Sequence, residues 1–415
     1  MTSSPSIRWM DRYIGSLACF MLSLLGRLPF SRSKKGPIKN ILLIELFEMG
    51  ASIMTSPSIR FIQARFPEAR IYVLTTQSIR SSWLKIGDLE PGRVLALKED
   101  GVFSFLFSYL QVLRTLNRIP VDAVIDFELF FRITAIFSFF IRAGRKGGFL
   151  RYHLEGLYRG SIYDSGCHFN QNTHIAKNFL ALTKTVLGDA KDFPQYKNNL
   201  LVEELVLTPY RSQGNALVDL KMKIPDFISG PYLLVAPDVG PNLSVRNYPL
   251  DRLAGVLGEI LREFPEVRVG MIGTRENIPH CEKLSQLVQS DRLVSLAGRT
   301  TMDELFELLR GAKLLISNDN GPVHFAALTD TPTLALYSTD SPFVYGSLGR
   351  CLILYSFYQC SPCIMAYNHK RSDCLDNKCL QAIPETTVSS FALRILRNDP
   401  AIRYQTINNS TPYLY

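Results

Sequence analysis

The chain has 415 residues, of which 47% are hydrophobic and 20% charged, and its formal net charge is +9. This composition excludes a disordered or collagen-like chain and is long enough for two ordinary domains with apolar cores. Seven basic residues lie within residues 1–40, where Asp11 is the only acid, so the positive charge is local and does not predict a nucleic-acid groove along the whole protein.

Residues 1–38 form a basic, hydrophobic segment that we expect to associate with a membrane. Between Arg12 and Arg27 lie fourteen uncharged residues, YIGSLACFMLSLLG, fewer than the roughly twenty that a bilayer span needs. No A-x-A-like cleavage site follows, and basic residues flank both ends. We favour a helix in the membrane interface with Trp9 and Tyr13 at its edge; the alternatives are a true span or uncleaved signal, and a helix packed on the protein body.

Residues 39–205 alternate between strand-like and helix-like stretches. The run KNILLIEL predicts a buried parallel strand, and RIYVLT, RVLAL and DAVIDF predict three more. Helices are expected between them, notably over residues 102–117. This β-α-β alternation requires right-handed crossovers and predicts a doubly wound sheet.

The stretch 128–149, ELFFRITAIFSFFIRAGRKGGF, has two interpretations. In the first, it is a helix that packs on the sheet and ends at the glycines, with one shared face formed by Phe130, Ile133, Phe137 and Phe140. In the second, the stretch contacts an acceptor or a lipid, and a cluster of basic residues binds phosphate groups of that molecule. The residues of this acceptor-binding cluster are Arg142, Arg145 and Lys146.

Residues 206–230 are rich in turn formers and are expected to link the first domain to a second one at 231–400, which a polar tail at 401–415 follows. In the second domain, YLLVAP, VRVGMIG, LVSLAG, KLLIS and TLALY predict five strands that alternate with four helices. The helix after TMDE has the spacing of a capping box, from Thr301 to Glu304. The chain is therefore expected to be an α/β protein with two Rossmann-like domains.

The motif SNDNGPVH follows a predicted strand of the second domain. Asp319, Asn320 and Gly321 come where the strand ends, which is the edge at which parallel sheets bind ligands. The backbone N–H groups of the following helical turn can bind a phosphate, and His324 in that turn can donate to a phosphate oxygen. Asp319 is expected to fix the loop or bind a sugar hydroxyl. The alternative is a capped helix with a core histidine.

Two further loops strengthen the hypothesis of a nucleotide site. APDVGPNLSVRNYP follows a strand and contains Arg246, which can neutralise a diphosphate. IGTRE ends the next strand and contains Glu276, where a ribose can be held. Polar residues in three loops at the same edge of the sheet favour a nucleotide-binding site over a chance placement of polar residues.

With these motifs the chain resembles glycosyltransferase family 9, which includes the ADP-heptose:lipopolysaccharide heptosyltransferases. The resemblance covers residues 40–395 and is most specific at SNDNGPVHFAAL. The corresponding motif of the family is close to S-N-D-S-G-P-x-H-x-A-A. It implies two Rossmann-like domains facing a central cleft (the GT-B arrangement), inversion of the anomeric centre and no catalytic metal. It also implies that the donor, favoured to be an ADP-sugar, is held by Asp319, Asn320, Gly321, His324, Arg246 and, less directly, Glu276.

The first loop departs from the family pattern. The family has L-G-D there, with the aspartate proposed as the base that deprotonates the acceptor hydroxyl, whereas FEMGAS has Ala51 in its place. Alanine cannot accept a proton. Glu48 lies three residues earlier and is the expected replacement, since general-base help is worth roughly 10²–10⁴ in rate. Alternatively, Glu48 is a solvated loop residue and another base acts, or activity is lost.

Four cysteines have the spacing C-x2-C-x10-C-x4-C: Cys360, Cys363, Cys374 and Cys379. Four thiolates can hold a structural zinc ion, but this spacing is looser than that of a usual zinc ribbon. The same four residues are also compatible with disulfides or with free thiols. The eight cysteines show no disulfide-dense pattern, which favours a cytosolic location.

The sequence therefore predicts a hexosyl- or heptosyl-transferring enzyme that requires no cofactor. It would move a sugar from a nucleotide-sugar donor to a glycolipid or oligosaccharide hydroxyl of a lipopolysaccharide core or related surface glycan. The expected location is the cytoplasmic face of the inner membrane, peripherally bound, with the cytoplasm as second choice and no nucleic-acid partner. The alternatives are a membrane-associated, non-catalytic nucleotide-sugar-binding homologue that has lost the base, and a two-domain sugar-nucleotide epimerase that needs no acceptor.

Overall fold

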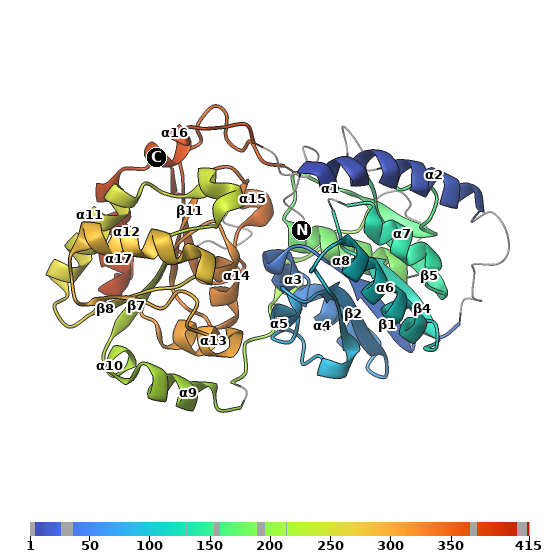
Figure 1. Cartoon of the computed structure of the whole chain (residues 1–415), viewed down its shortest axis with the longest axis horizontal. Coiled ribbons are helices and arrows are strands. Elements are labelled where there is room, and N and C mark those ends of the chain that lie inside the picture. The colour runs from blue at the N-terminus through green and yellow to red at the C-terminus, as the bar shows by residue number, and fades with distance from the viewer. Residues whose placement is uncertain are drawn as a thin grey trace. The chain divides into compact units, whose positions relative to one another are not determined.

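The computed structural model describes residues 5–25, 36–129, 131–152, 158–188, 196–212, 214–365, 372–404 and 413–414. These residues divide into two compact units, the first ending at Thr208 and the second beginning at Pro209 (Figure 1). Each unit contains one parallel sheet flanked by helices. The prediction of two Rossmann-like α/β domains is therefore confirmed.

The first domain has a six-stranded sheet in the order β3-β2-β1-β4-β5-β6. Its strands are β1 (Asn40–Ile44), β2 (Arg70–Thr76), β3 (Val94–Leu97), β4 (Val121–Asp126), β5 (Ala143–Tyr152) and β6 (Ser165–Phe169). β1 is buried over its whole length, as expected for the continuous apolar run NILLI. The chain moves outward from β1 to β3 and then returns to β4, so the winding direction reverses between β1 and β4.

Helices cover both faces of this sheet (Figure 1). The helical segments of the domain after β1 are α3 (Met49–Met54), α4 (Ser56–Arg65), α5 (Arg80–Trp83), η3 (Pro91–Arg93), α6 (Val102–Leu116), α7 (Ile133–Phe140), α8 (Ile175–Leu187) and η4 (Val202–Leu205). α6 and α7 share an apolar core with β1 and β4, where Phe105 and Phe137 meet Leu42 and Ile44. α4 packs on α8, which contacts β4, β5 and β6 from the opposite face.

The stretch after α7 differs from the prediction. We expected a helix over residues 128–149 that ends at the glycines, but the helix ends at Phe140 and Gly147 and Gly148 lie inside strand β5. A Cβ on Gly147 would approach Cγ2 of Val186 to 2.1 Å, and one on Gly148 would approach the Tyr163 ring to 2.7 Å. These glycines therefore allow close packing on the strand and do not mark a helix end.

The N-terminal segment packs on the first domain. It consists of α1 (Pro5–Met10), a π-helical turn η1 (Asp11–Gly15) and α2 (Ser16–Leu25). Cys19 is fully buried in a cluster with Ala135 of α7, Ile162 and Tyr163. Within the described residues, no helix is both long enough and apolar enough to cross a membrane. The inner face of this segment thus corresponds to the packed-helix alternative.

The second domain has a seven-stranded parallel sheet in the order β13-β12-β11-β10-β7-β8-β9. Its strands are β7 (Tyr232–Ala236), β8 (Arg268–Met271), β9 (Leu293–Ser295), β10 (Leu315–Asn318), β11 (Thr333–Tyr337), β12 (Cys351–Tyr355) and β13 (Tyr413–Leu414). The five predicted strands are present, and β12 and β13 were not predicted. Here the winding direction reverses between β7 and β10.

Helices also flank the second sheet on both faces. They are α9 (Ala216–Lys223), α10 (Pro225–Ile228), η5 (Pro241–Arg246), α11 (Leu250–Glu263), η6 (Arg275–Asn277), α12 (Ile278–Val288), α13 (Met302–Gly311), α14 (Gly321–Leu328), α15 (Pro342–Tyr345), α16 (Lys378–Gln381) and α17 (Glu385–Leu396). α11 packs on α12 and α17 on one face, while α13 packs on α14 and α9 on the other. The predicted capping box is present, because Thr301 Oγ1 accepts from the Glu304 N–H at 3.3 Å and Glu304 accepts from the Thr301 N–H at 2.7 Å.

Candidate functional site

Polar groups of the second domain gather where the winding direction reverses. The loops after β7 and β10 start from neighbouring strands, and the loop after β11 starts from the next strand along. Asn318, at the end of β10, accepts a hydrogen bond from the Tyr248 N–H at 3.0 Å and donates one to the Pro237 carbonyl at 3.1 Å. The loops after β7 and β10 are thereby tied together at the edge where open α/β sheets bind ligands.

Arg246 is the centre of this edge. Arg246 is 7% exposed, and its guanidinium contacts residues from two other loops. Nε donates to Thr339 Oγ1 at 3.0 Å, another nitrogen pairs with Asp340, and the third lies 3.7 Å from Asp319 Oδ2. The structure therefore brings the predicted residues Arg246 and Asp319 together, and two carboxylates surround the one guanidinium.

The turn from Asp319 to His324 connects β10 directly to α14. Asn320 precedes the helix in extended backbone, and its side-chain oxygen accepts from Ser317 Oγ at 2.7 Å. α14 begins at Gly321, so the N–H groups of its first turn lie at the same edge as Arg246. His324 lies in that turn and is 8% exposed. This geometry suits an anion bound at the helix N-terminus.

The loop after β8 extends the edge by one more strand. Asn277 of η6 donates to Asp238 Oδ2 at 2.8 Å, which connects this loop to the one after β7. Burial opposes ionisation of Asp238, but hydrogen bonds from Asn277, Asn247 and the Gly240 N–H outweigh it and lower the pKa of Asp238. Glu276 is exposed beside Asn277. The structure thus places Glu276 at this edge, two strands away from β10.

In the first domain, carboxylates gather at the corresponding point between β1 and β4. Glu45 directly follows β1, is 2% exposed, and accepts the N–H groups of Phe47 and Glu48 at 3.2 and 2.7 Å. Burial raises the pKa of Glu45 well above its ordinary value, and repulsion from Glu128 and Glu48 adds to this effect. Glu128 follows β4 and is 1% exposed. Three acidic side chains therefore interact at this edge.

Glu48 and Ala51 lie at the start of α3. Glu48 is the residue before the helix, is half-buried, and has extended backbone. Ala51 is buried within the first turn of the helix. The carboxylate that the sequence analysis expects to replace the missing aspartate is thus at the carboxyl edge of the sheet, next to Glu45.

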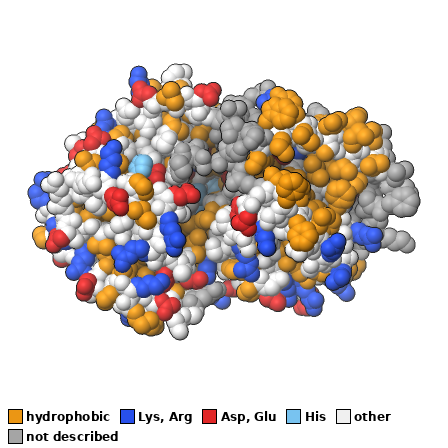
Figure 2. Space-filling model, viewed as in Figure 1, with side chains coloured by type: hydrophobic (Ala, Val, Ile, Leu, Met, Phe, Trp, Pro, Cys, Tyr) orange, Lys and Arg blue, Asp and Glu red, His pale blue; other side chains and the backbone are white. Residues whose placement is uncertain are grey.

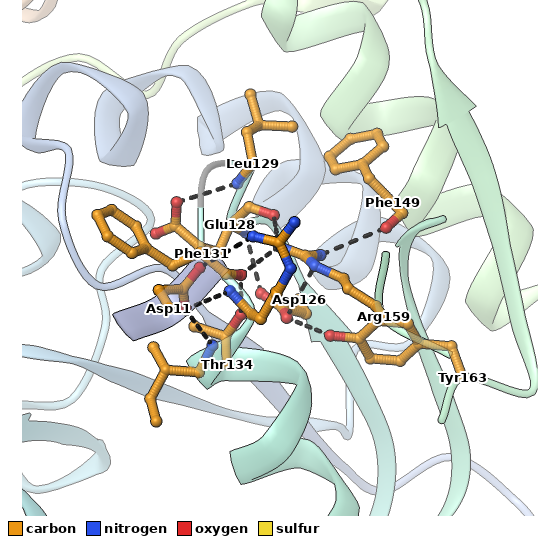
Figure 3. A network of polar contacts seen from close by, with 11 residues as sticks. Asp11, Asp126, Glu128, Leu129, Phe131, Thr134, Phe149, Arg159 and Tyr163 are labelled. Atoms are coloured by element: carbon orange, nitrogen blue, oxygen red, sulfur yellow. Dashed lines mark hydrogen bonds and ion pairs between the residues drawn. The ribbon is translucent and has the colours of Figure 1, made fainter. Parts of the chain in front are cut away.

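A buried network supports the loop after β4 (Figure 3). Arg159 is 1% exposed and donates to the carbonyls of Glu128 and Phe131 at 2.6 and 2.8 Å. It also lies 3.7 Å from Asp126 Oδ2, which accepts a hydrogen bond from the Tyr163 hydroxyl. Burial raises the pKa of Asp126, although Arg159 partly offsets this effect. Arg159 therefore fixes the backbone that carries Glu128.

The predicted acceptor-binding cations do not lie at that edge. Arg145 and Lys146 are opposite Ala123 and Val124 of β4, two to three positions before Asp126, where the carboxyl edge begins. Arg145 donates to the carbonyls of Leu187 and Gly188 at the end of α8, at 3.4 and 3.3 Å. The buried Lys146 donates to the Phe139 carbonyl at 3.0 Å. Arg142 remains exposed beside the end of α6, and of the predicted face Phe137 is buried, Phe140 is exposed and Phe130 lies outside the described residues.

The four grouped cysteines lie near the loop after β11. The N–H groups of Cys363 and Ile364 donate to the Thr339 carbonyl at 2.9 and 2.8 Å, so the C-x2-C turn fastens the loop that contacts Arg246. None of the eight cysteines, all of which lie in the described ranges, is disulfide-bonded. Across the described ranges, no three His, Cys, Asp or Glu side chains are grouped as metal ligands. Burial raises the pKa of Cys379.

The partners of these candidate residues could not be predicted from the sequence. Asp340 and Thr339 follow a predicted strand, so their position at the carboxyl edge was a signal, but nothing in the sequence shows that they contact Arg246. Asp126 is the penultimate residue of the predicted strand DAVIDF and the last of β4, which gave the same signal for the first domain. Arg159 comes from an irregular segment before β6, and no local pattern distinguishes it.

Two Rossmann-like domains in one chain are compatible with the GT-B class of glycosyltransferase folds. The profile of glycosyltransferase family 9 (heptosyltransferase) matches residues 109–371, more than half of the chain. The chain belongs to this family, and it is accordingly a glycosyltransferase.

Relatives of known name agree with this assignment. Lipopolysaccharide heptosyltransferase 1 of Campylobacter coli is 20% identical over 310 residues, which are 73% of this chain and 85% of that protein. Lipooligosaccharide heptosyltransferase 2 of Haemophilus influenzae is 27% identical over 168 residues, 39% of this chain and 45% of that protein. Both are heptosyltransferases by name.

Solved structures show the same fold. ADP-heptose lipopolysaccharide heptosyltransferase II of E. coli has a TM-score of 0.67 at 16% identity, covering 87% of this chain and 100% of its own. E. coli heptosyltransferase WaaC with ADP has a TM-score of 0.62 at 15% identity, covering 86% of this chain and 99% of its own.

Proposed function

We propose that this chain is an inverting glycosyltransferase that moves a sugar, with heptose as the first candidate, from a nucleotide-sugar donor to a hydroxyl of a lipopolysaccharide core or a related surface glycan. The observation that carries the proposal is the cluster at the reversal point of the second sheet, where Arg246 and Asp319 meet beside the N-terminus of α14. The heptosyltransferase relatives support the sugar and the acceptor, and the E. coli neighbour solved with ADP supports an ADP-sugar as donor.

In this proposal the second domain binds the donor diphosphate. The N–H groups of the first turn of α14, with His324, hold the phosphate oxygens. Arg246 offsets the charge that develops on the leaving diphosphate, which requires it to loosen its pairs with Asp319 and Asp340. Glu276 and Asn320 contact the nucleoside or the sugar. These protein groups supply the positive charge, so we expect transfer to persist when divalent metals are chelated.

The first domain would supply the base. The acceptor oxygen attacks the anomeric carbon of the donor, the bond from that carbon to the diphosphate oxygen breaks, and Glu48 takes the proton of the acceptor hydroxyl. A single displacement of this kind inverts the anomeric centre. Glu45 interacts electrostatically with Glu48 and Glu128, and burial together with this repulsion raises the pKa of Glu45, which favours its neutral form beside the proposed base. Arg142 is the exposed member of the proposed acceptor-binding cations, Arg142, Arg145 and Lys146.

The proposed acceptor is part of a glycolipid, so the proposed place of action is the cytoplasmic face of the inner membrane, with the cytoplasm as second choice. The N-terminal segment would associate with that surface. The cysteine group would be structural, as free thiols or with a zinc ion in one of its sites, and elemental analysis of the purified protein distinguishes the two.

The rival proposal is a nucleotide-sugar-binding homologue without turnover. Ala51 in place of the family aspartate favours it. Such a protein would be stabilised by the donor but would release no nucleotide with any acceptor.

The test is a thermal-shift screen of nucleotide sugars, followed by a transfer assay with the stabilising donor and lipid-linked or free core oligosaccharides. We expect an ADP-sugar to raise the melting temperature and to yield a product of inverted configuration. His324→Ala should weaken donor binding by about tenfold or more, the loss of one charge-assisted hydrogen bond. Donor binding without product from any acceptor would favour the rival, and the absence of binding by every nucleotide sugar would reject both.

A further inference from the structure

The first domain exposes large apolar side chains on neighbouring helices (Figure 2). On the N-terminal segment the exposed apolar residues are Trp9, Met10, Tyr13, Ile14, Leu17, Phe20, Met21, Leu24 and Leu25. On α6 they are Val102, Phe103, Leu106, Phe107 and Leu110, with Phe103 90% exposed. Soluble monomers rarely expose contiguous apolar patches of this kind unless the patch binds something.

The two sets belong to one helical layer with α7 between them. Phe137 of α7 stacks on Tyr109 of α6 with ring centroids 3.6 Å apart. From the other side, Ile136 and Phe139 of α7 pack on the cluster that buries Cys19 of α2. Phe140, at the end of α7, is itself 46% exposed, so the apolar surface continues across the layer.

The N-terminal segment is held rigidly in this layer. Asp11 accepts the N–H groups of Arg132 and Ile133 at 2.8 and 3.1 Å, just where α7 begins, and pairs with the Arg132 guanidinium at 3.2 Å. Ser23 Oγ accepts the Ser161 N–H at 2.8 Å. Asp11 and Ser23 therefore point to the domain, and the outer face of the segment keeps the exposed apolar residues.

On the helices of this surface the exposed charges are positive, and the exposed acid Asp100 precedes α6. α6 and α7 contain no acidic residue, and the acid of the N-terminal segment, Asp11, is turned inward against Arg132. Exposed cations are present at the rim: Arg12 beside Tyr13, and Arg114 at the end of α6 on the same helical stripe as Phe103, Phe107 and Leu110. Arg142 adjoins Phe140.

We propose that the outer faces of α1, α2 and α6, with Phe140, form one docking surface for an anionic lipid bilayer. Aromatic and aliphatic side chains would enter the headgroup region while the arginines contact lipid phosphates. A second copy of the chain fits less well, because a symmetric contact would bring the same cations together. The inference extends the proposed membrane association from the N-terminal segment to α6, and it does not depend on the transfer chemistry.

The test is flotation of the full chain with vesicles of phosphatidylcholine alone and of phosphatidylcholine mixed with phosphatidylglycerol. The parent protein should float with the mixed vesicles, and added salt should weaken the binding. The double variant Phe103→Ser, Phe107→Ser should lower the vesicle-bound to free ratio by about tenfold or more. The matched control, Val218→Ser with Met222→Ser on the exposed face of α9, should stay within about twofold of the parent.

Further measurements keep the outcomes distinct. The α6 variant should retain the parent's melting temperature and its thermal shift with nucleotide sugar, so failure of the proposed transferase activity would not affect the result. The proposal that α6 belongs to the docking surface is wrong if the α6 variant floats like the parent while the double variant Leu17→Ser, Met21→Ser does not. The proposal of a lipid-docking surface is also wrong if the parent does not bind vesicles and instead forms a dimer that the α6 substitutions dissociate.

Discussion

Glu45 and Glu48 have different surroundings although they are three residues apart. Glu45 is buried and holds the loop through two backbone N–H groups, whereas Glu48 is half-buried at the start of α3. A general base must reach the substrate hydroxyl, which favours Glu48. Glu45 instead fixes the backbone on which Glu48 lies.

Glu48→Gln is expected to lower kcat by roughly 10²–10⁴ and to leave the dissociation constant of the donor unchanged, because an amide cannot take the proton. Steady-state kinetics with donor titration checks this. Glu68→Gln, an exposed acid after α4, is the matched control and should keep parental rates. Parental turnover in Glu48→Gln would remove Glu48 from the mechanism.

Glu45→Gln should change the pH dependence of stability. The folded-state pKa of Glu45 is raised, so the stability that protonated Glu45 contributes is fully present below its unfolded pKa and is lost as pH rises through the folded pKa. Glutamine keeps the acceptor oxygen and cannot ionise. The variant should therefore gain stability relative to the parent as pH rises from the unfolded pKa towards the raised folded pKa, by at most about 1.4 kcal/mol per pH unit. Melting curves across this range measure the difference, and a constant difference would contradict the shift.

Arg246→Met should destabilise the second domain by about 3–5 kcal/mol, because Asp319 and Asp340 would remain buried without their shared cation. Urea unfolding followed by a probe in the second domain measures this. Arg262→Met, an exposed arginine on α11, should change the free energy of unfolding by no more than about 0.5 kcal/mol. Equal effects of the two substitutions would show that the Arg246 cluster does not stabilise the domain.

At the scale of elements, the strands that are clear in the sequence are those with apolar runs, and they include the edge strands β3 and β9 as well as strands in the middle of each sheet. β1 and β7 are short, mainly apolar runs, and this pattern is what burial on both faces requires. β5 was missed because RKGGF combines charges with glycines, whose role depends on Val186 and Tyr163 far along the chain. The candidate site was likewise predictable only in part. The positions of its loops follow from the ends of the predicted strands, but the pairing of Arg246 with Asp340 depends on tertiary contacts that the sequence does not show.

Gly147→Ala is expected to destabilise the first domain by about 1–3 kcal/mol, since its Cβ would overlap Cγ2 of Val186 at 2.1 Å. Gly258→Ala is the matched control: it lies within α11 with no atom near the new Cβ, so it should stabilise its helix by up to about 1 kcal/mol. Thermal unfolding of both variants checks the opposite signs. A neutral Gly147→Ala would mean that β5 and α8 adjust without strain.

At the scale of the whole molecule, the proposed donor groups all belong to the second unit. A nucleotide sugar at a hundred times its Kd should raise the free energy of unfolding of that unit by about 2.7 kcal/mol. Hydrogen exchange with the donor bound should show increased protection of backbone amides in the loops after β7 and β10. Protection confined to the first unit would contradict the assignment of the donor site.

The docking of the N-terminal segment also bears on how the chain folds as it is made. Asp11 finds its partner at Arg132, 121 residues later, and Ser23 finds its partner at Ser161, 138 residues later. At the usual speed of translation these partners emerge on the order of ten seconds after the segment itself. During that interval the inner face of the segment lacks its protein partner, so both of its faces are exposed. A nascent chain near a lipid surface would therefore meet the bilayer before its own first domain exists, and the domain would complete its fold against a helix already at the membrane.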